Sequence, residues 1–241
     1  MELNVIYEDK DILICYKPAG IATQTAKLSG QDMVSLLKNY LAKKENIKNP
    51  YVGVIHRLDQ PVSGLLVFAK NQKAAGNLSK QIQDGNANKD YIAMCSGILD
   101  EKAGELTHYI RKDSATKLAK ALDENSFLKM QAEKNEESNE YKKAILTYEV
   151  EKETEDCSII KVHLQTGRFH QIRAQFSCMG HSLLGDAKYG TPVSRELSMK
   201  KRMNKIALCA NHLTLKHPTT GKEMDFALGE KYLPRWYKEM K

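Results

Sequence analysis

The stretch HRLDQPVSGLLVFAK, residues 56–70, is the most informative part of this 241-residue chain. It places one carboxylate, Asp59, beside Arg57 and before a Pro-Val-Ser-Gly bend, and it then enters an apolar run. Such a run is typical of a buried strand, which we predict over residues 64–69. A carboxylate on a bend that leads into a buried strand is held in place by the surrounding chain. Asp59 is therefore a candidate catalytic group.

A second block, QTGRFHQIR at residues 165–173, combines two arginines with a tight entry into a helix that we predict to end at Gly180. Ile172 falls on the apolar face of that helix, so we expect Arg173 on its polar face. Spacing alone favours the simpler interpretation that Arg168, His170 and Arg173 decorate a surface helix, and the presence of both blocks in this order favours a functional role.

The two blocks together resemble the signature of the RluA-type pseudouridine synthases, in which His-Arg-Leu-Asp precedes Gly-Leu-Leu, and Thr-Gly-Arg-Thr-His-Gln-Ile-Arg follows later. Three further segments are similar to family elements and extend the match over nearly the whole chain: KDYIA at 89–93, GHSLLGDAKYG at 180–190 and ANHLTLKHPTTG at 210–221. The resemblance implies an α+β protein with the pseudouridine synthase fold, a largely antiparallel central sheet flanked by helices. Strands that outnumber helices and are joined by short turns are compatible with it.

The activity that the resemblance implies is the isomerisation of specific uridines in tRNA or rRNA to pseudouridine. The target base leaves its stack, the glycosidic bond breaks, and the base rejoins the sugar through C5. This reaction involves no net oxidation, hydrolysis or group donor, so we expect neither a cofactor nor a metal. Attack of the carboxylate at C1′ of the sugar and attack at C6 of the base both remain open.

The resemblance also implies a role for individual residues. Asp59 would be the nucleophile, Tyr91 would stack on the everted base, and Arg57 would fill its place in the RNA. Because burial alone would raise the pKa of a carboxylate and neutralise it, Asp59 needs a cation close by, and Arg173 is our candidate. The other substrate-binding candidates are Arg168, Ile172, Leu65 or Leu66, and cations that could contact phosphates, namely Lys188, Lys200, Lys201 and Arg202.

Three positions depart from the family pattern. Val62 stands where the family usually has Thr, Phe169 also replaces a Thr, and Gln175 stands where many members have His. These positions flank the proposed catalytic residues, so they bear on substrate identity or loop packing more than on the chemistry.

The composition is compatible with an RNA partner. The formal net charge is +7 and the sequence pI is about 9.0, which favours nucleic acid or a membrane surface as a partner. The first residues show no secretory pattern and no window approaches the length of a membrane span, so we expect a cytoplasmic protein without a membrane partner. Five scattered cysteines predict neither a disulfide framework nor a zinc site, and the histidine pairs His163/His170 and His212/His217 lack the helical spacing of metal ligands.

We expect one catalytic domain over residues 1–241, without the S4 RNA-binding domain of some relatives, acting as a monomer with no obligatory protein partner. Ser29 and Asp32 resemble a variant capping box at the start of a helix. The polar block 133–140 has no apolar period and predicts an exposed charged excursion around 112–143. Helices are predicted at 33–41, 74–82 and 170–179, and further strands at 5–7, 12–16, 90–98, 105–111, 144–150, 158–164, 206–209, 213–216 and 223–227.

Two other classes of function are compatible with these residues. One is a non-catalytic RNA-binding protein on a synthase scaffold, and the other is a nucleoside hydrolase or base-removing glycosylase. Asp59, Tyr91 and Arg173 argue against the first, because pure binding needs no nucleophile. Product analysis separates the three, since they yield pseudouridine, no product, or an abasic site.

Overall fold

The computed structural model describes residues 3–25 and 31–239 of the chain. The chain divides into two compact units, Met1–Lys89 with Cys209–Lys238, and Asp90–Leu208 with Glu239–Lys241. Such a division does not by itself make two domains, and the single catalytic domain stays a prediction. No described helix has both the length and the apolar composition to cross a membrane.

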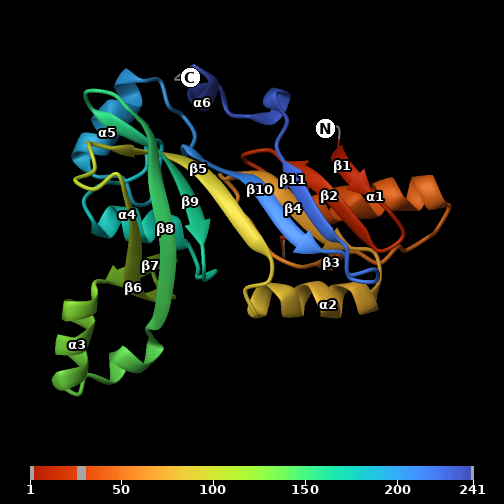
Figure 1. Cartoon of the computed structure of the whole chain (residues 1–241), viewed down its shortest axis with the longest axis horizontal. Coiled ribbons are helices and arrows are strands. Elements are labelled where there is room, and N and C mark those ends of the chain that lie inside the picture. Colours follow the sequence, from red (N-terminus) through yellow and green to blue (C-terminus); the bar gives the residue numbers. More distant parts are fainter. Residues whose placement is uncertain (1–2, 26–30, 240–241) are drawn as a thin grey trace. The chain divides into compact units, whose positions relative to one another are not determined.

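The first unit contains strands in the order β1-β2-β4-β10, with β3 paired to β4 and β11 paired to β10 (Figure 1). All these pairings are antiparallel except that of β4 with β10. Four of the predicted strands are confirmed, whereas the two short strands predicted at 206–209 and 213–216 are one continuous strand, β10. The bounds are β1 Asn4–Glu8, β2 Ile12–Lys17, β3 Gly53–Val54, β4 Ser63–Ala69, β10 Leu208–Lys216 and β11 Glu223–Ala227.

Strand β4 lies at the centre of this unit and directly follows Asp59. All seven of its residues are buried, which explains why the sequence there is a continuous apolar run. Gly64 in β4 has φ +136°, and a Cβ at this position would stand 2.3 Å from the carbonyl oxygen of Ala210 in β10. Only glycine therefore allows the two strands to pair at this point.

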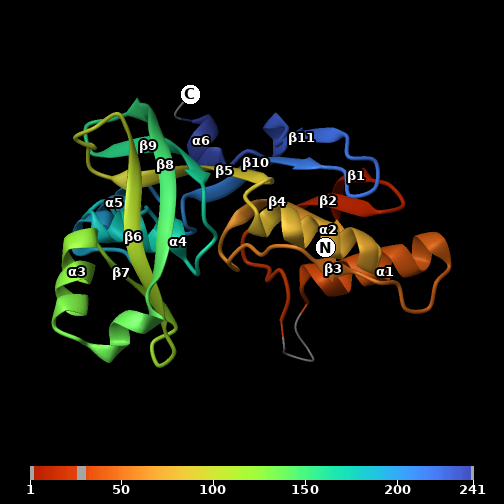
Figure 2. The ribbon, with the colours of Figure 1, turned by 60° about the horizontal axis from the view of Figure 1, so that its bottom comes forward.

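Two helices, α1 (Met33–Glu45) and α2 (Gln72–Gln83), lie below β10 and β11 in Figure 2. The N-cap of α1 is Asp32, whose carboxylate accepts the N–H of Ser35, while Ser29 lies outside the described residues. Asn71 caps α2, and its amide also donates to Asp11 at 2.8 Å. The C-terminal elements of this unit are the 3₁₀ helix η2 Glu230–Tyr232 and helix α6 Arg235–Lys238.

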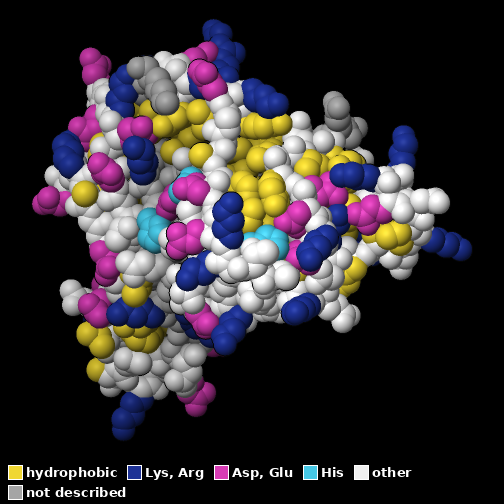
Figure 3. Space-filling view, turned by 45° about the vertical axis from the view of Figure 1, so that its right-hand side comes forward, with side chains coloured by type: hydrophobic (Ala, Val, Ile, Leu, Met, Phe, Trp, Pro, Cys, Tyr) yellow, Lys and Arg dark blue, Asp and Glu magenta, His cyan; other side chains and the backbone are white. Residues whose placement is uncertain are grey.

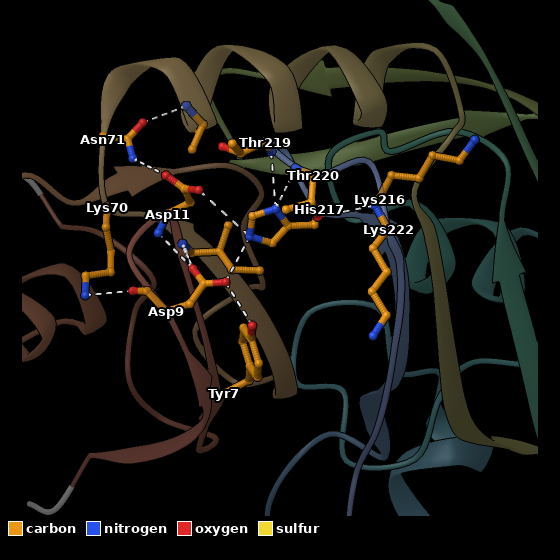
Figure 4. Close-up of polar contacts among 12 residues, drawn as sticks. Tyr7, Asp9, Asp11, Lys70, Asn71, Lys216, His217, Thr219, Thr220 and Lys222 are labelled. Carbon is orange, nitrogen blue, oxygen red and sulfur yellow. Dashed lines mark hydrogen bonds and ion pairs between the residues drawn. The ribbon is translucent and has the colours of Figure 1, made fainter.

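A polar network joins the β1–β2 turn to the β10–β11 turn (Figure 4). One oxygen of Asp9 accepts the backbone N–H groups of Asp11 and Ile12 at 2.8 and 2.9 Å. The other accepts the hydroxyl of Tyr7 at 2.8 Å and Nε2 of His217 at 2.9 Å. Burial alone would raise the pKa of Asp9, but these four hydrogen bonds outweigh it and hold the pKa below its usual value.

The direction of the His217 bond follows from its other nitrogen. Nδ1 accepts the backbone N–H groups of Thr219 and Thr220 at 3.2 and 3.1 Å. A backbone N–H only donates, so the proton of the neutral imidazole resides on Nε2, which donates to Asp9. The β10–β11 turn thereby fixes the tautomer of His217, and in this tautomer His217 donates to Asp9 of the β1–β2 turn.

The depressed pKa of Asp9 makes the stability of the fold depend on pH. The network contributes stability above the ordinary pKa of 3.8, and that stability is lost as the pH falls through the lower pKa of the folded state. Each oxygen of Asp9 accepts two hydrogen bonds, and Asp9→Asn replaces one of these oxygens with an NH2 group that can only donate. We therefore expect this substitution to lower the free energy of unfolding by about 1–3 kcal/mol at pH 7. Urea unfolding at pH 7 and pH 3 measures this.

The difference between wild type and Asp9→Asn should shrink as the pH falls below 4, because the wild-type carboxylate then also becomes protonated. The exposed Asp100 provides a control, and Asp100→Asn should unfold like wild type at both pH values. An Asp9→Asn deficit of the same size at pH 3 and pH 7 would contradict this assignment.

The second unit contains strands in the order β5-β9-β8-β6-β7, and every adjacent pair is antiparallel. The strands predicted at 90–98, 105–111, 144–150 and 158–164 are confirmed. The bounds are β5 Asn88–Ser96, β6 Ala103–Asp113, β7 Leu118–Leu122, β8 Lys142–Glu153 and β9 Cys157–Leu164.

The charged excursion around 112–143 is largely exposed, and it is regularly folded. This stretch holds β7, helix α3 (Glu124–Ala132) and the 3₁₀ helix η1 (Glu136–Glu140). Phe127 of α3 stacks on Tyr109 of β6, with ring centroids 3.7 Å apart, and lies 6.3 Å from the ring of Tyr141. Three aromatic rings are enough to dock a polar segment whose own sequence has no apolar period.

Helix α4 (Gln171–Cys178) packs on the other face of β6, and α5 (Pro192–Lys200) follows it. Ile110 of β6 and Ala174 of α4 belong to one buried cluster, whereas Tyr109, the neighbour of Ile110, points towards α3. Residues 171–176 are all buried, so the expectation that Arg173 lies on an open polar face is wrong. Its side chain is only 4% exposed.

Candidate active site

Asp59 lies in an irregular loop between β3 and β4, and both backbone polar groups of its neighbour Leu58 are hydrogen-bonded. The hydroxyl of Thr23 accepts the backbone N–H of Leu58 at 3.1 Å and donates to the carbonyl of Leu58 at 3.0 Å. The carbonyl of Asp59 accepts the N–H of Val62 at 3.0 Å, which closes the turn. These bonds fix the backbone on either side of Asp59.

Lys17, at the end of β2, holds the other side of the same loop. Its side chain is fully buried, and Nζ donates to the carbonyls of Pro18, Ile21 and Gln60 at 3.2, 2.7 and 3.1 Å. Burial lowers the pKa of Lys17 to about 8, while the Asp59 carboxylate acts in the opposite direction. No motif in the sequence points to Lys17, so sequence reasoning missed this residue.

His56 fixes the start of the loop. Its Nε2 accepts the backbone N–H of Val67 in β4 at 3.3 Å. Burial, with the charge of Lys89 as a smaller cause, lowers the pKa of His56 to about 3. The imidazole is therefore neutral at physiological pH and acts as an anchor for the loop.

The other predicted site residues of the first unit differ in exposure. Arg57 is exposed, as contact with RNA requires. Leu66 has no exposed surface and pairs with Cys15 inside the sheet, so it is a core residue of this unit. Its contact with substrate stays a prediction.

Four predicted site residues belong to the second unit. Tyr91 lies in β5 opposite Val162 and is 6% exposed. Ile172 is 4% exposed in α4, whereas Arg168, just before that helix, is exposed and donates from Nε to the carbonyl of Lys143 at 2.9 Å.

The fourth residue, Arg173, has a partner that sequence reasoning missed. Its Nε and Nη2 donate to the two oxygens of Asp186, both at 2.8 Å. Oδ1 of Asp186 also accepts the backbone N–H groups of Lys188 and Tyr189 at 2.9 and 3.2 Å. A bidentate pair of this kind fixes the plane of the guanidinium as well as its position.

Burial of Asp186 would by itself raise its pKa. The hydrogen bonds and the charge of Arg173, together with the two backbone N–H groups, outweigh this effect and hold the pKa of Asp186 below its usual value. The Gly-Asp element at 185–186 was visible in the sequence, but nothing in the local pattern linked it to an arginine thirteen residues earlier.

The departures from the family pattern are accommodated locally. Val62 is buried, and Gln175 donates from Nε2 to the carbonyl of Leu106 at 3.0 Å and approaches Nδ1 of His108 at 3.1 Å. Phe169 stacks on His170, with ring centroids 3.7 Å apart. The side chains of Gln175 and Phe169, which differ from the family signature, thus each have a contact partner within this unit.

The predicted phosphate-binding cations fall into two groups. Lys200 and Lys201 lie 3.8 and 2.8 Å from the carboxylate of Asp156, so their charges are balanced locally. Arg168 and Lys188 are exposed and form no ion pair with any residue that the structure describes. Within the same residues no group of three His, Cys, Asp or Glu side chains is arranged to hold a metal ion.

Comparisons with known proteins identify the class. The family model of the RNA pseudouridylate synthases matches residues 11–178. The chain belongs to this family and is an RNA pseudouridine synthase of the RluA type. The family membership argues for isomerisation over the hydrolase and the pure binding protein.

Relatives from bacteria match over nearly the whole chain. An RNA pseudouridine synthase of Aquifex aeolicus is 33% identical over 238 residues, covering 95% of this chain and 69% of its own length. The tRNA pseudouridine synthase C of Haemophilus ducreyi is 31% identical over 222 residues, covering 91% and 88%. The ribosomal large subunit pseudouridine synthase D of Zymomonas mobilis is 30% identical over 231 residues, covering 93% and 68%.

Solved structures confirm the fold. Human RNA pseudouridylate synthase domain containing 4 matches with a TM-score of 0.74 and 21% identity, covering 98% of this chain and 91% of that one. Human RNA pseudouridylate synthase domain containing 1 matches with a TM-score of 0.71 and 22% identity, covering 97% and 85%. The α+β fold with a mostly antiparallel arrangement of strands is thus the fold of pseudouridylate synthases.

Proposed function

We propose that this enzyme converts uridines of ribosomal or transfer RNA to pseudouridine with Asp59 as the nucleophile. The observation that carries the proposal is the loop around Asp59, which the Thr23 hydroxyl and the buried Lys17 ammonium hold through backbone groups alone. A carboxylate whose backbone is fixed in this way is positioned for attack.

In the proposed reaction the uridine leaves its stack and Arg57 fills the gap. The carboxylate of Asp59 attacks C1′ or C6, the bond between N1 and C1′ breaks, and the rotated base forms a bond from C5 to C1′. The bond from Asp59 to C1′ or C6 then breaks, which restores the free carboxylate. The C5 proton is lost and N1 gains a proton, so no atom is added or removed overall. Tyr91 would stack on the base and Arg173 would favour the ionised form of the nucleophile.

The roles of Arg168, Ile172 and Leu66 as substrate contacts belong to the same proposal. So does a monomeric protein that acts in the cytoplasm without a cofactor. The names of the relatives support both RNA classes, because one of them is a ribosomal large subunit enzyme and another is a tRNA enzyme.

Mapping pseudouridine in total RNA from cells with and without this gene tests the proposal. We expect at least one uridine of ribosomal or transfer RNA to lose its modification in the deletion strain, and the purified protein to restore it on the unmodified RNA. Unchanged pseudouridine maps in both RNA classes would contradict the proposed substrate, and an abasic site in place of pseudouridine would contradict the chemistry.

A further inference from the structure

We propose that a basic surface of the second unit binds the phosphodiester backbone of the substrate RNA. This surface, the Phe169 patch, consists of Lys112, Lys142, Arg168, Phe169 and Lys188. The inference rests on the proposed function for the identity of the polyanion. It goes beyond that function by assigning affinity for RNA to residues other than the predicted catalytic ones.

Strand pairing places two of the lysines on one face. Lys142 of β8 stands directly opposite Ile110 of β6, and paired residues of antiparallel strands project to the same side. Lys112 is two positions beyond Ile110 and projects to that side as well. Phe169 packs against the buried cluster that contains Ile110, so both lysines and this ring share a face.

The ring of Phe169 also orients a charge. Nζ of Lys112 lies over it, 5.0 Å from the ring centroid, which is within the range of a cation–π contact. The ring also stacks on the imidazole of His170, with centroids 3.7 Å apart. Phe169 is one of the departures from the family pattern, so the contact with Lys112 is a property of this chain.

The remaining two cations are tied to the same strands by their side chains. Arg168 donates from Nε to the carbonyl of Lys143, the residue next to Lys142, and its Nη groups have no acceptor among the described residues. Nζ of Lys188 donates to the carbonyl of Lys117 at 3.1 Å, in the turn that joins β6 to β7. Both side chains are anchored at one point and still present hydrogen-bond donors to solvent.

Among the described residues, no carboxylate forms an ion pair with a cation of the patch. Nearby carboxylates already have partners, since Asp113 pairs with Lys120 at 3.4 Å, and Glu137 and Glu140 pair with Arg111 at 3.0 and 3.2 Å. The four patch cations are exposed and form no ion pair with a described residue. Figure 3 shows one face of the molecule, on which basic and acidic side chains are interspersed.

Exposed cations without local counter-charges raise the concentration of a polyanion at the surface. Lysine ammonium groups and a guanidinium contact phosphate oxygens irrespective of the base sequence, so the patch contributes affinity and orientation. It does not choose the uridine that reacts.

Charge-removing variants of the full chain test the patch. The probe is a fluorescein-labelled RNA stem-loop, and the dissociation constant is measured by fluorescence anisotropy over a range of salt concentrations. We expect each of Lys112→Gln, Lys142→Gln, Arg168→Gln and Lys188→Gln to weaken binding about three- to fivefold, and the slope of log K against log salt to fall by about 0.7–0.9 per variant.

Lys143→Gln is the matched control. Lys143 is exposed and adjacent to Lys142, but it stands opposite Tyr109 and therefore projects to the other face of β8. We expect this variant to bind like wild type. Equal losses in Lys143→Gln and the patch variants would overturn the proposal, because net charge alone would then explain binding, and so would unchanged salt slopes in all patch variants.

Phe169 acts through Lys112 and is a positioning residue. Phe169→Thr should weaken RNA binding, whereas Phe169→Tyr, which keeps an aromatic face, should restore it. In turnover assays the patch variants should raise KM and leave kcat unchanged. A fall in kcat at unchanged KM would overturn the assignment.

The proposal of an RNA-binding patch and the proposal of Asp59 as the nucleophile can be rejected independently of each other. Normal RNA binding by the patch variants overturns the patch while leaving the role of Asp59 intact. Pseudouridine formation by Asp59→Ala overturns the nucleophile while leaving the binding measurements intact.

Discussion

Asp59→Ala should abolish pseudouridine formation while leaving the fold and the affinity for RNA close to those of wild type. The carboxylate is the proposed nucleophile, and removing a nucleophile typically lowers turnover by roughly 10⁴-fold or more. The bonds that hold the loop join the backbone of Leu58 and Gln60 to Thr23 and Lys17, so they survive the substitution. Single-turnover assays with a uridine-containing RNA measure the loss.

Two variants sharpen this prediction. Asp59→Asn keeps the shape of the side chain but lacks the negative charge, so it should be as inactive as Asp59→Ala. Asp84→Ala removes an exposed carboxylate from the same unit and should turn over at the wild-type rate. Wild-type turnover by a folded Asp59→Ala protein would reject the nucleophile.

Asp186→Ala should be the most destabilising single substitution that we predict. It leaves the guanidinium of Arg173 buried without its bidentate partner, and breaking a buried pair from one side costs about 3–5 kcal/mol of unfolding free energy. Urea unfolding monitored by circular dichroism gives the difference. Asp225→Ala, which removes the 70% exposed partner of His212, should cost less than about 1 kcal/mol and serves as the control.

A double variant separates stability from chemistry at this pair. Arg173→Met combined with Asp186→Leu replaces two buried charges by apolar side chains, and such replacements are often neutral or stabilising. We expect the double variant to recover most of the stability lost in Asp186→Ala and to remain inactive, because Arg173 has the proposed electrostatic role. Recovery of activity together with stability would show that the pair is only structural.

Most of the strands and the three helices α1, α2 and α4 were predictable because their sequences carry the necessary periods locally. The continuous apolar run of β4 reflects burial on both faces, and the predicted stop of α4 at Gly180 coincides with a glycine at φ +84°. The segment 112–143 was not predictable in this way. Its order depends on Phe127 meeting Tyr109 and Tyr141, which come from other parts of the chain.

Residues of the candidate site were predictable only where they belong to a recognisable sequence motif. Asp59 and Arg173 stand within recognisable blocks, but the partners that position them do not follow from those blocks. Lys17 donates to the carbonyl of Gln60, forty-three residues later in the sequence, and Asp186 binds Arg173 from the segment that follows α4. Contacts of this kind depend on tertiary structure, so no local pattern encodes them.

The loop held by Thr23 and Lys17 has a thermodynamic consequence for the recognition of RNA. Ordering a backbone residue costs about 1–2 kcal/mol in conformational entropy, and for this loop that loss occurs when the protein folds. The free energy released on association is then available for unstacking the target nucleotide, which itself requires a few kcal/mol. A pre-ordered loop thus makes eversion of the uridine, and not rearrangement of the enzyme, the main conformational cost of complex formation.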